Sequence, residues 1–511
     1  MFKRFGKSTE KVYVEKKTDC KESPRLTKGL EENMGLFKTI FSNDDTFMVR
    51  EFQNKYLKKV KGCLLYIEEM TDNEIMNENI IQPLLDNDFK EHIDENNLLE
   101  EIKVKIIASN SVEKSSDVYG IVHSIINGDT ALLLQGHDQA LVIGSKGWQT
   151  RGVEEPPSER VVRGPREGFN ESLMINLSMV RRKIKNPDLK FKFKELGVRT
   201  RTKTCICYIE GLASDQILRE LNIRLDKIDL DSILDSGYIQ EFIKDAPFSP
   251  FETIGSSERP DTVAGKLLEG RIALFVDGSP FVLTLPFLFL EYFQVNEDYY
   301  NNYIFSSFIR VLRIVGAFLS VSVPAVYVAL ITFHQEMIPT PLLLSISAAR
   351  QGVPFPTILE ALLMVFIFEV LREAGARMPT VIGQAISIVG ALVLGEAAVE
   401  AKIVSAPMVI VVGLTGITSL LSYKMQGSMI FFRYTFLLLA SFLGMYGYVF
   451  GLLGLTIHLM GIRSFGVPYT MSFGSMKPED IKDSTIRAPW WYMDLRPRLI
   501  TAKNIVRKSR K

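Results

Sequence analysis

The stretch YIEEMTDNEI at residues 66–75 recurs as YIEGLASDQI at residues 208–217. A second stretch, GDTALLLQG from Gly128, recurs as GRIALFVDG from Gly270. Both repeats have the same offset, because 208 exceeds 66 and 270 exceeds 128 by 142. Two matches in one register indicate an internal duplication. The sequence therefore predicts two related folding units.

Each unit is expected to begin with a strand, Cys63–Glu68 in the first and Cys205–Glu210 in the second, followed by a helix-start signal. Helical stretches and then a hairpin come next, and Asp277-Gly278 in the second hairpin is a favoured tight-turn pair. A strand, helices and a hairpin predict an α/β or α+β unit of roughly 100 residues.

Charge and hydropathy divide the 511 residues into two parts, although the formal net charge is only +1 and 47% of the residues are hydrophobic. Charged residues are frequent up to about residue 260, whereas long stretches between about 300 and 461 carry almost none. We expect a multi-domain α/β or α+β cytoplasmic region followed by an all-α transmembrane domain. The expected boundaries are a flexible basic arm at 1–30, the first unit at 31–145, a connecting helix and the second unit with a membrane-proximal hairpin at 146–300, helices with four to six crossings at 301–461, and a basic cytoplasmic tail at 462–511.

The N-terminal arm contains Lys and Arg but no apolar run, so we expect no signal peptide and a cytoplasmic location for the soluble units. Cys63, Cys205 and Cys207 lie in predicted strands, which is typical of a reduced compartment. The five histidines are scattered without metal-ligand spacing. We expect no metal site and no cofactor.

The sequence offers no catalytic motif. Gly265-Lys266-Leu267 resembles part of a phosphate-binding loop, but Pro260 stands where glycine is required and Leu267 where Ser or Thr is required. Basic residues in VVRGPREGF and SMVRRKI fit either an anion site or a solvated or inter-subunit face. We expect no enzymatic activity, no catalytic residue and no nucleic-acid partner.

Four stretches of about 20 mostly apolar residues have the length of membrane spans. Arg310 and Arg313 precede the first of them, and the tail from Arg463 onward carries 11 Lys or Arg against 4 Asp or Glu. The positive-inside rule then predicts that both ends of the chain are cytoplasmic and that the number of crossings is even, four or six. The expected spans are Ile314–Phe333, Thr380–Val399, Ile403–Leu421 and Tyr434–Gly461.

Glycines recur on one face of two expected spans, which predicts close helix packing. The spacing fits packing within one subunit and packing between subunits equally well. The residues concerned are Gly383, Gly390 and Gly395 in one span and Gly444, Gly447, Gly451 and Gly454 in another.

The stretch PFPTILEALLMVFIFEVLREAGARMP, residues 354–379, carries charges inside the apolar part of the chain. Glu369 and Glu373 share a helical face and are spaced to pair with Arg372 and Arg377, whereas Glu360 lies on the opposite face. One interpretation is an amphipathic helix at the membrane interface with paired charges. The other is a helix that faces a water-filled pore or a protein interior, because charge exposed to lipid is costly.

Several long motifs resemble the A-subunit family of bacterial spore germination receptors, the GerA family, from about residue 35 to 490. The motifs are RGPREGF, SERPDTVAGKLLEGRIALFVDGSPFVLTLP, PFPTILEALL, LREAGARMP, GQAISIVGALVLGEAAVEAKIVS and SFGVPY. The resemblance implies a protein of the spore inner membrane that works with a transporter-like, germinant-binding B subunit and a lipoprotein C subunit. It also implies contact with membrane lipid and a homo-oligomer, with a pentamer as the expected form, that acts as a ligand-gated cation channel.

Two positions depart from the family pattern. Val365 stands where members often carry another glutamate, and Glu396 stands where glutamine is common. The resemblance favours a pore or subunit interface over an interfacial helix for the charged stretch. The candidate residues for such a pore or interface are Glu360, Glu369, Arg372, Glu373, Arg377 and Glu396.

Two alternatives to a receptor subunit stay open. The chain could be an accessory paralogue for the release of ions or dipicolinate, or a membrane scaffold that conducts nothing. Neighbouring genes for a ten-span transporter-like protein and a lipoprotein would favour the receptor.

Overall fold

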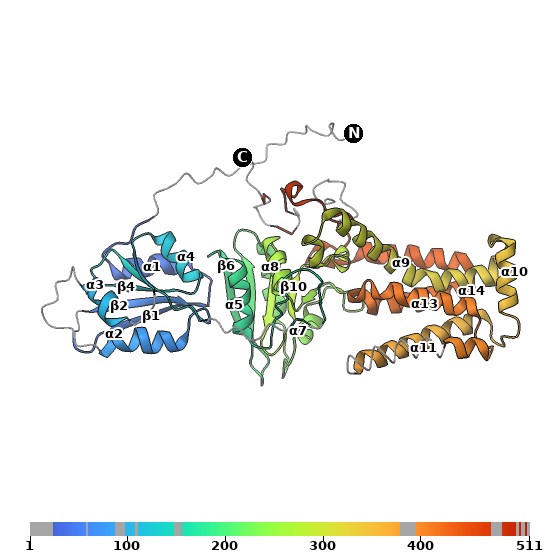
Figure 1. Cartoon of the computed structure of the whole chain (residues 1–511), viewed down its shortest axis with the longest axis horizontal. Helices are drawn as coiled ribbons and strands as arrows, with labels where there is room; N and C mark the ends of the chain where they lie inside the picture. Colours follow the sequence, from blue (N-terminus) through green and yellow to red (C-terminus); the bar gives the residue numbers. More distant parts are fainter. Residues whose placement is uncertain are drawn as a thin grey trace, which may run out of the picture. The chain divides into compact units, whose positions relative to one another are not determined.

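A computed structural model describes residues 24–57, 60–86, 98–107, 111–147, 155–156, 158–378, 395–471, 483–496, 500–501 and 506–507. The chain divides into two compact units, one of residues 1–151 and 177–191 and the other of residues 152–176 and 192–511. Figure 1 labels the helices and strands of both.

The first five-stranded sheet has the order β1-β2-β4-β5-β3. Neighbouring strands are antiparallel throughout. The strands are β1 Phe47–Gln53, β2 Lys61–Ile67, β3 Val112–Ser115, β4 Thr130–Leu134 and β5 Ala140–Ile143.

The second five-stranded sheet has the order β6-β7-β9-β10-β8, which is the same topology. The registers agree as well: Cys63 lies opposite Leu133 in the first sheet, and Cys205 lies opposite Phe275 in the second, each residue 142 positions further along. The predicted fold class, with two related units, is therefore confirmed. The strands are β6 Leu189–Leu196, β7 Thr202–Ile209, β8 Gly255–Ser257, β9 Ile272–Val276 and β10 Val282–Leu285.

The helices of the two sheet regions begin at residues suited to a helix N-terminus. The Asp117 carboxylate accepts hydrogen bonds from the first free amides of α4, and Pro260 occupies the first turn of α8, where a missing N–H costs nothing. Both helices bury one apolar face. The helices are α1 Leu30–Ile40, η1 Ile75–Ile81, α2 Gln82–Asp86, α3 Leu98–Glu101, η3 Ile102–Ile106, α4 Val118–Ile126, α5 Leu173–Lys183, α6 Asp215–Asp226, α7 Ser236–Ile243 and α8 Pro260–Leu268.

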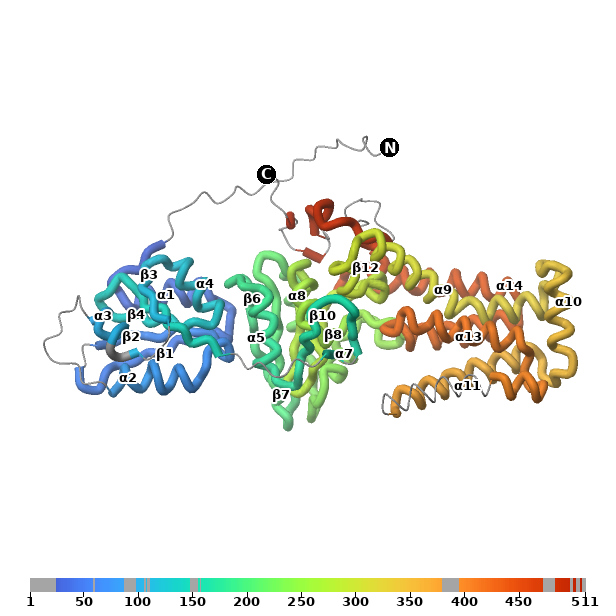
Figure 2. The backbone as a smooth tube through the Cα atoms, viewed as in Figure 1, coloured from blue at the N-terminus to red at the C-terminus, as the bar shows by residue number. Residues whose placement is uncertain are grey.

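A helical region follows the second sheet, and α9, α13 and α14 run side by side in it (Figure 2). Two stretches of the described chain, Tyr303–Phe333 and Tyr423–Gly461, are long and apolar enough to cross a membrane. The elements are η4 Phe289–Tyr292, η5 Asn296–Tyr299, α9 Tyr303–Phe333, η6 Gln335–Met337, α10 Thr340–Ala349, α11 Thr357–Arg377, α13 Ala406–Leu420, η7 Tyr423–Met425 and α14 Gln426–Gly461. Most of the expected span Thr380–Val399 lies outside the described residues.

The expectation of one continuous span at Tyr434–Gly461 is wrong, because α14 reverses direction at Gly444. This glycine has φ 60° and ψ −139°, a conformation that costs little only without a Cβ. The ring of Phe251 lies 5.3 Å from that of Phe432 and 6.3 Å from that of His458. These two residues would be about 39 Å apart in a straight helix, so α14 is a hairpin of two legs.

The chain after α14 packs into the second sheet region. Phe465, Val467 and Ile500 belong to the same buried cluster as Ile206 and Leu274. The residue pair Ala213–Thr501 forms a bridge in this region, and Thr71–Lys146 forms the corresponding bridge in the first. In the first repeat, the partner residue Lys146 comes directly after that repeat's own hairpin. In the second repeat, the partner residue Thr501 comes from the C-terminal segment instead. Its elements are β11 Arg463–Ser464, β12 Val467–Pro468 and η8 Trp490–Tyr492.

The hairpin predicts different outcomes for two glycines of α14. A Cβ on Gly447 would lie 2.1 Å from the Leu439 carbonyl oxygen, whereas a Cβ on Gly454 would meet nothing within 4 Å. We expect Gly447→Ala to destabilise the protein by about 1–3 kcal/mol, the usual cost of overpacking, and Gly454→Ala to be nearly neutral. Thermal unfolding of the purified protein in detergent measures both; equal midpoints for the two variants would contradict the hairpin.

Candidate functional site

A buried ion cluster joins three helices of the helical region. Arg433 of α14 is 1% exposed, and its guanidinium donates to the Glu369 carboxylate of α11. It also donates to the backbone oxygen and the hydroxyl of Ser320 in α9, at 2.9 and 2.8 Å. Arg372 adds a second cation, 2.6 Å from the other Glu369 oxygen. Glu369 is therefore enclosed and neutralised within the chain.

Glu360 lies at the opposite end of α11 and is fully buried. One carboxylate oxygen accepts hydrogen bonds from the backbone nitrogen and the hydroxyl of Ser405, both at 2.5 Å, just before α13 begins. The other oxygen lies 3.9 Å from Nε of Arg350, beyond hydrogen-bond distance. Glu360 thus connects the start of α11 to the start of α13.

The remaining charged pair of α11, Glu373 and Arg377, is exposed. The two side chains are 2.7 Å apart and are 59% and 80% exposed. They continue a stripe of exposed apolar side chains at spacings of four and three residues. The stripe consists of Leu359, Leu363, Phe366 and Val370, followed by Glu373 and Arg377.

The other predicted site residues do not join this cluster. Glu396 is exposed, and a Cβ on Gly395 would lie 3.4 Å from Val409. Gly451 faces Phe436 of the first hairpin leg. Gly383 and Gly390 lie outside the described residues, and the packing roles of the glycines stay predictions.

A second ion cluster lies at the beginning of α9. Arg310 is fully buried, with Nε 3.2 Å from the Asp298 carboxylate and Nη1 2.9 Å from that of Asp483. Arg313 lies 3.0 Å from Asp298. The sequence predicts from these two arginines that the start of the first span faces the cytoplasm, and that orientation stays a prediction. In the structure both are paired with carboxylates, which come from η5 and the C-terminal segment.

Glu159 forms a further link between the second sheet region and the helices. Its carboxylate pairs with Lys424 of η7 and accepts a hydrogen bond from the Ser257 hydroxyl of β8 at 2.6 Å. Burial alone would raise the pKa of Glu159, but the Lys424 ammonium and these hydrogen bonds hold that pKa below its ordinary value.

Sequence reasoning missed Arg433, Arg350 and Ser405 as members of these clusters. Arg433 interrupts the apolar run FFRYTF, and an arginine in such a run is a signal for an internal partner. The expected span Tyr434–Gly461 begins one residue after Arg433 and so excludes it. Among the residues that the structure describes, no group of three or more His, Cys, Asp or Glu side chains could hold a metal ion.

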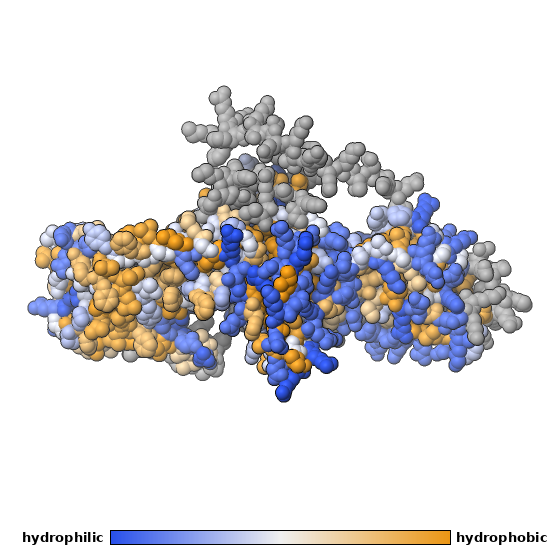
Figure 3. All heavy atoms as spheres, turned by 180° about the vertical axis from the view of Figure 1, so that it is seen from behind, coloured by the Kyte–Doolittle hydropathy of each residue, from blue (hydrophilic) through white to orange (hydrophobic). Residues whose placement is uncertain are grey.

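The geometry first defines a class of protein. Two α/β sheet regions of one topology precede helices that keep several charges inside and many large apolar side chains outside, among them Phe318, Ile410, Phe442 and Phe450. Figure 3 shows the orange apolar surface of this helical region at the left. An apolar exterior of this extent indicates a membrane-associated protein.

Comparison with known proteins identifies the family. The family model "Bacillus/Clostridium GerA spore germination protein" matches residues 35–499. The chain therefore belongs to the GerA family.

Two relatives in Bacillus subtilis (strain 168) are each 42% identical to the chain. Spore germination protein KA aligns over 490 residues, which are 96% of this chain and 89% of the relative. The uncharacterized membrane protein YfkQ aligns over 486 residues, 95% of this chain and 93% of the relative. A crystal structure of the N-terminal domain of the A subunit of the Bacillus megaterium spore germinant receptor GerK3 is 35% identical; the match covers 53% of this chain and 99% of that one, with a TM-score of 0.43.

Glu369 and Glu373 lie one helical turn apart on α11, but the first is enclosed and the second exposed, so we expect them to behave differently. Glu369→Gln leaves the buried Arg433 without its carboxylate, a change that costs about 3–5 kcal/mol. Glu373→Gln removes an exposed pair worth roughly 0.3–0.5 kcal/mol. We expect a large fall in the unfolding midpoint and in membrane abundance for the first variant and almost none for the second. Wild-type stability of Glu369→Gln would show that the buried pair contributes little.

The Glu159–Lys424 pair predicts a pH-dependent contribution to stability. A carboxyl group with a lowered pKa in the folded state stabilises the protein above its unfolded pKa, about 4.5, and loses this effect as the pH falls through the folded value. Lys424→Met should therefore destabilise by about 1.5–3 kcal/mol at pH 7, with a difference from wild type that shrinks below pH 4.5. The exposed Lys227→Met serves as the control, and a difference independent of pH would rule out the charge as its cause.

Proposed function

We propose that this chain is the A subunit of a nutrient germinant receptor in the spore inner membrane and forms, with copies of itself, a cation-conducting pore. Membership of the GerA family and the names of its relatives, such as spore germination protein KA, support the role in germination. The chain acts without catalysis in this proposal, together with a transporter-like B subunit and a lipoprotein C subunit. Its sheet regions and C-terminal tail lie in the cytoplasm.

The observation that carries the pore is the exposed stripe on α11. The buried cluster around Arg433 fixes Glu369 toward the protein, and the stripe that begins at Leu359 is exposed, pointing away from the other helices that the structure describes. In an assembly of several copies, such a stripe would line a narrow apolar path with Glu373 at one end. Rings of carboxylates attract cations, and apolar constrictions gate by excluding water.

Spores that carry Glu373→Gln are expected to release potassium more slowly after germinant addition, because the negative charge at the end of the path is lost. The expected reduction is on the order of ten-fold, the lower end of the range for electrostatic focusing. The chain offers a matched control: Arg377→Gln breaks the same ion pair but removes a positive charge. We expect its potassium release to be unchanged or faster.

The two variants separate a charge effect from a structural one. Equal losses in Glu373→Gln and Arg377→Gln would assign the pair to structure, and normal release at normal abundance in both would reject Glu373 as part of a pore. Abundance is checked by immunoblot of spore membranes.

A different measurement separates a receptor subunit from an accessory release protein. YfkQ, at the same 42% identity, is named only as an uncharacterized membrane protein, so similarity alone does not decide between the two roles. Spores without a receptor subunit should fail to respond to one class of nutrient and respond normally to others. Slower release after every trigger would favour the accessory role, and copurification with B and C subunits would favour the receptor.

A further inference from the structure

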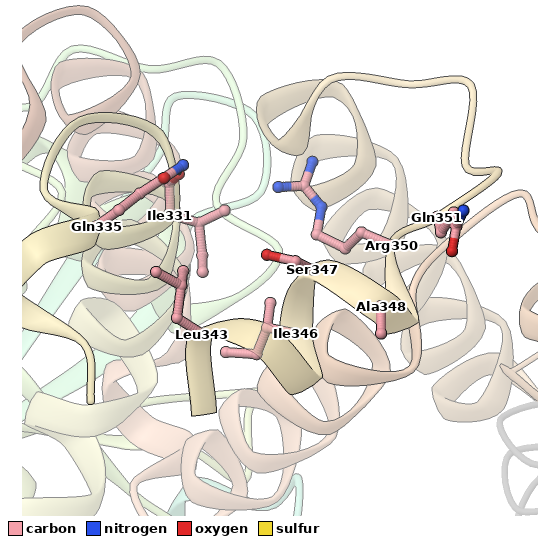
Figure 4. Close-up of a pocket in the computed structure, with 8 residues that line it drawn as sticks. All are labelled: Ile331, Gln335, Leu343, Ile346, Ser347, Ala348, Arg350 and Gln351. Atoms are coloured by element: carbon pink, nitrogen blue, oxygen red, sulfur yellow. The ribbon is translucent and has the colours of Figure 1, made fainter. Parts of the chain in front are cut away.

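A cavity of about 520 Å³ lies where α9 ends and α10 follows (Figure 4). This volume is within the range of small-molecule sites in proteins. Ile331, Leu343 and Ile346 supply apolar walls, and Gln335 and Ser347 supply polar atoms. Of the described residues that line the cavity, Arg350 alone is charged. The walls therefore suit a molecule with an apolar part and one charged group.

The Arg350 guanidinium makes no hydrogen bond to any described residue. Its Nε is buried and unpaired, and the nearest carboxylate oxygen, Oε2 of Glu360, is 3.9 Å away. The side chain is 24% exposed, and Figure 4 shows its terminal nitrogens directed into the open space above Ser347. A guanidinium carries five N–H donors in a planar fork that matches the two oxygens of a carboxylate.

Glu360 explains why Arg350 does not turn away from the cavity. The buried carboxylate attracts the inner edge of the guanidinium, while its other oxygen is already occupied by Ser405. Oε2 of Glu360 also lacks a hydrogen-bond partner among the described residues, and it lies 3.9 Å from the Nε of Arg350, which lacks one too. An anion on the outer nitrogens would leave this orientation intact and supply the missing acceptors.

We propose that this cavity binds a small carboxylic acid, with its carboxylate on the Nη groups of Arg350 and its apolar part against Ile331, Leu343 and Ile346. The site would respond to its ligand through Glu360, which lies behind Arg350 and joins α11 to Ser405 at the start of α13. This ligand site goes beyond the proposed pore function. It can be tested on the purified chain without measuring ion release, so the two proposals can fail independently. A lipid phosphate offers similar oxyanion chemistry, so the experiment has to separate the two sources.

The test uses thermal unfolding of the purified full-length protein in an uncharged, phosphate-free detergent. Sodium hexanoate is expected to raise the unfolding midpoint by a few degrees in a saturable way, because a ligand that binds only the folded state stabilises it. 1-Hexanol, which has the same alkyl chain without the charge, should produce no shift. The same unfolding measurement with inorganic phosphate, and with phosphatidylglycerol vesicles, tests whether the site binds a lipid headgroup instead.

Two variants and a control identify the site. Arg350→Gln should abolish the hexanoate shift, and Ser347→Phe should abolish it by filling the cavity while Arg350 remains. Arg377→Gln, which alters an exposed arginine of α11, should retain the full shift. A shift with phosphate or phosphatidylglycerol but not hexanoate would assign Arg350 to lipid and overturn the proposal. No shift in wild type, or an undiminished shift in Ser347→Phe and Arg350→Gln, would overturn it as well.

Discussion

The arrangement of the helices depends on a guanidinium group that cannot be left alone in an apolar interior. Arg433 requires acceptors, and α11 and α9 supply them through Glu369 and Ser320. Lipid tails are as apolar as leucine side chains, so apolar contacts alone do little to fix the rotation of helices in a membrane. The planar guanidinium of Arg433, in contrast, binds its acceptors in a defined geometry. Once Glu369 faces Arg433, the remaining surface of α11 and the position of its outward stripe are determined.

The repeated architecture could be predicted because a duplication leaves similar sequence stretches at a constant spacing. The interval of 142 residues was visible in two short stretches, and the same interval relates the strand partners of Cys63 and Cys205. Strand pairing follows from side chains that alternate between two faces, so related sequences keep the same register. Intrahelical pairs were also predictable, since Arg377 lies one turn beyond Glu373 and contacts it.

Contacts between distant segments could not be predicted from one sequence. Arg433 lies 64 residues beyond Glu369, and no local spacing relates the two. Gly444 was expected to support packing in a straight helix, because its spacing from Gly447 fits a helical face as well as it fits a reversal. Backbone conformation at a single glycine decides between these outcomes. The ion partners of Arg310 likewise come from η5 and from beyond residue 480, and counting charges near an expected span does not reveal them.

The packing of Ile500 and Thr501 into the second sheet region has a consequence for the order of events during synthesis. The first repeat has its complete set of strands once residue 143 has left the ribosome, and Lys146 forms its closing bridge. The second repeat has to wait for more than two hundred further residues, including every helix of the helical region. Domains usually fold as they emerge, N-terminal first. Here the core around Ile206 and Leu274 becomes complete only after translation has nearly ended, when the whole helical region has already been synthesised.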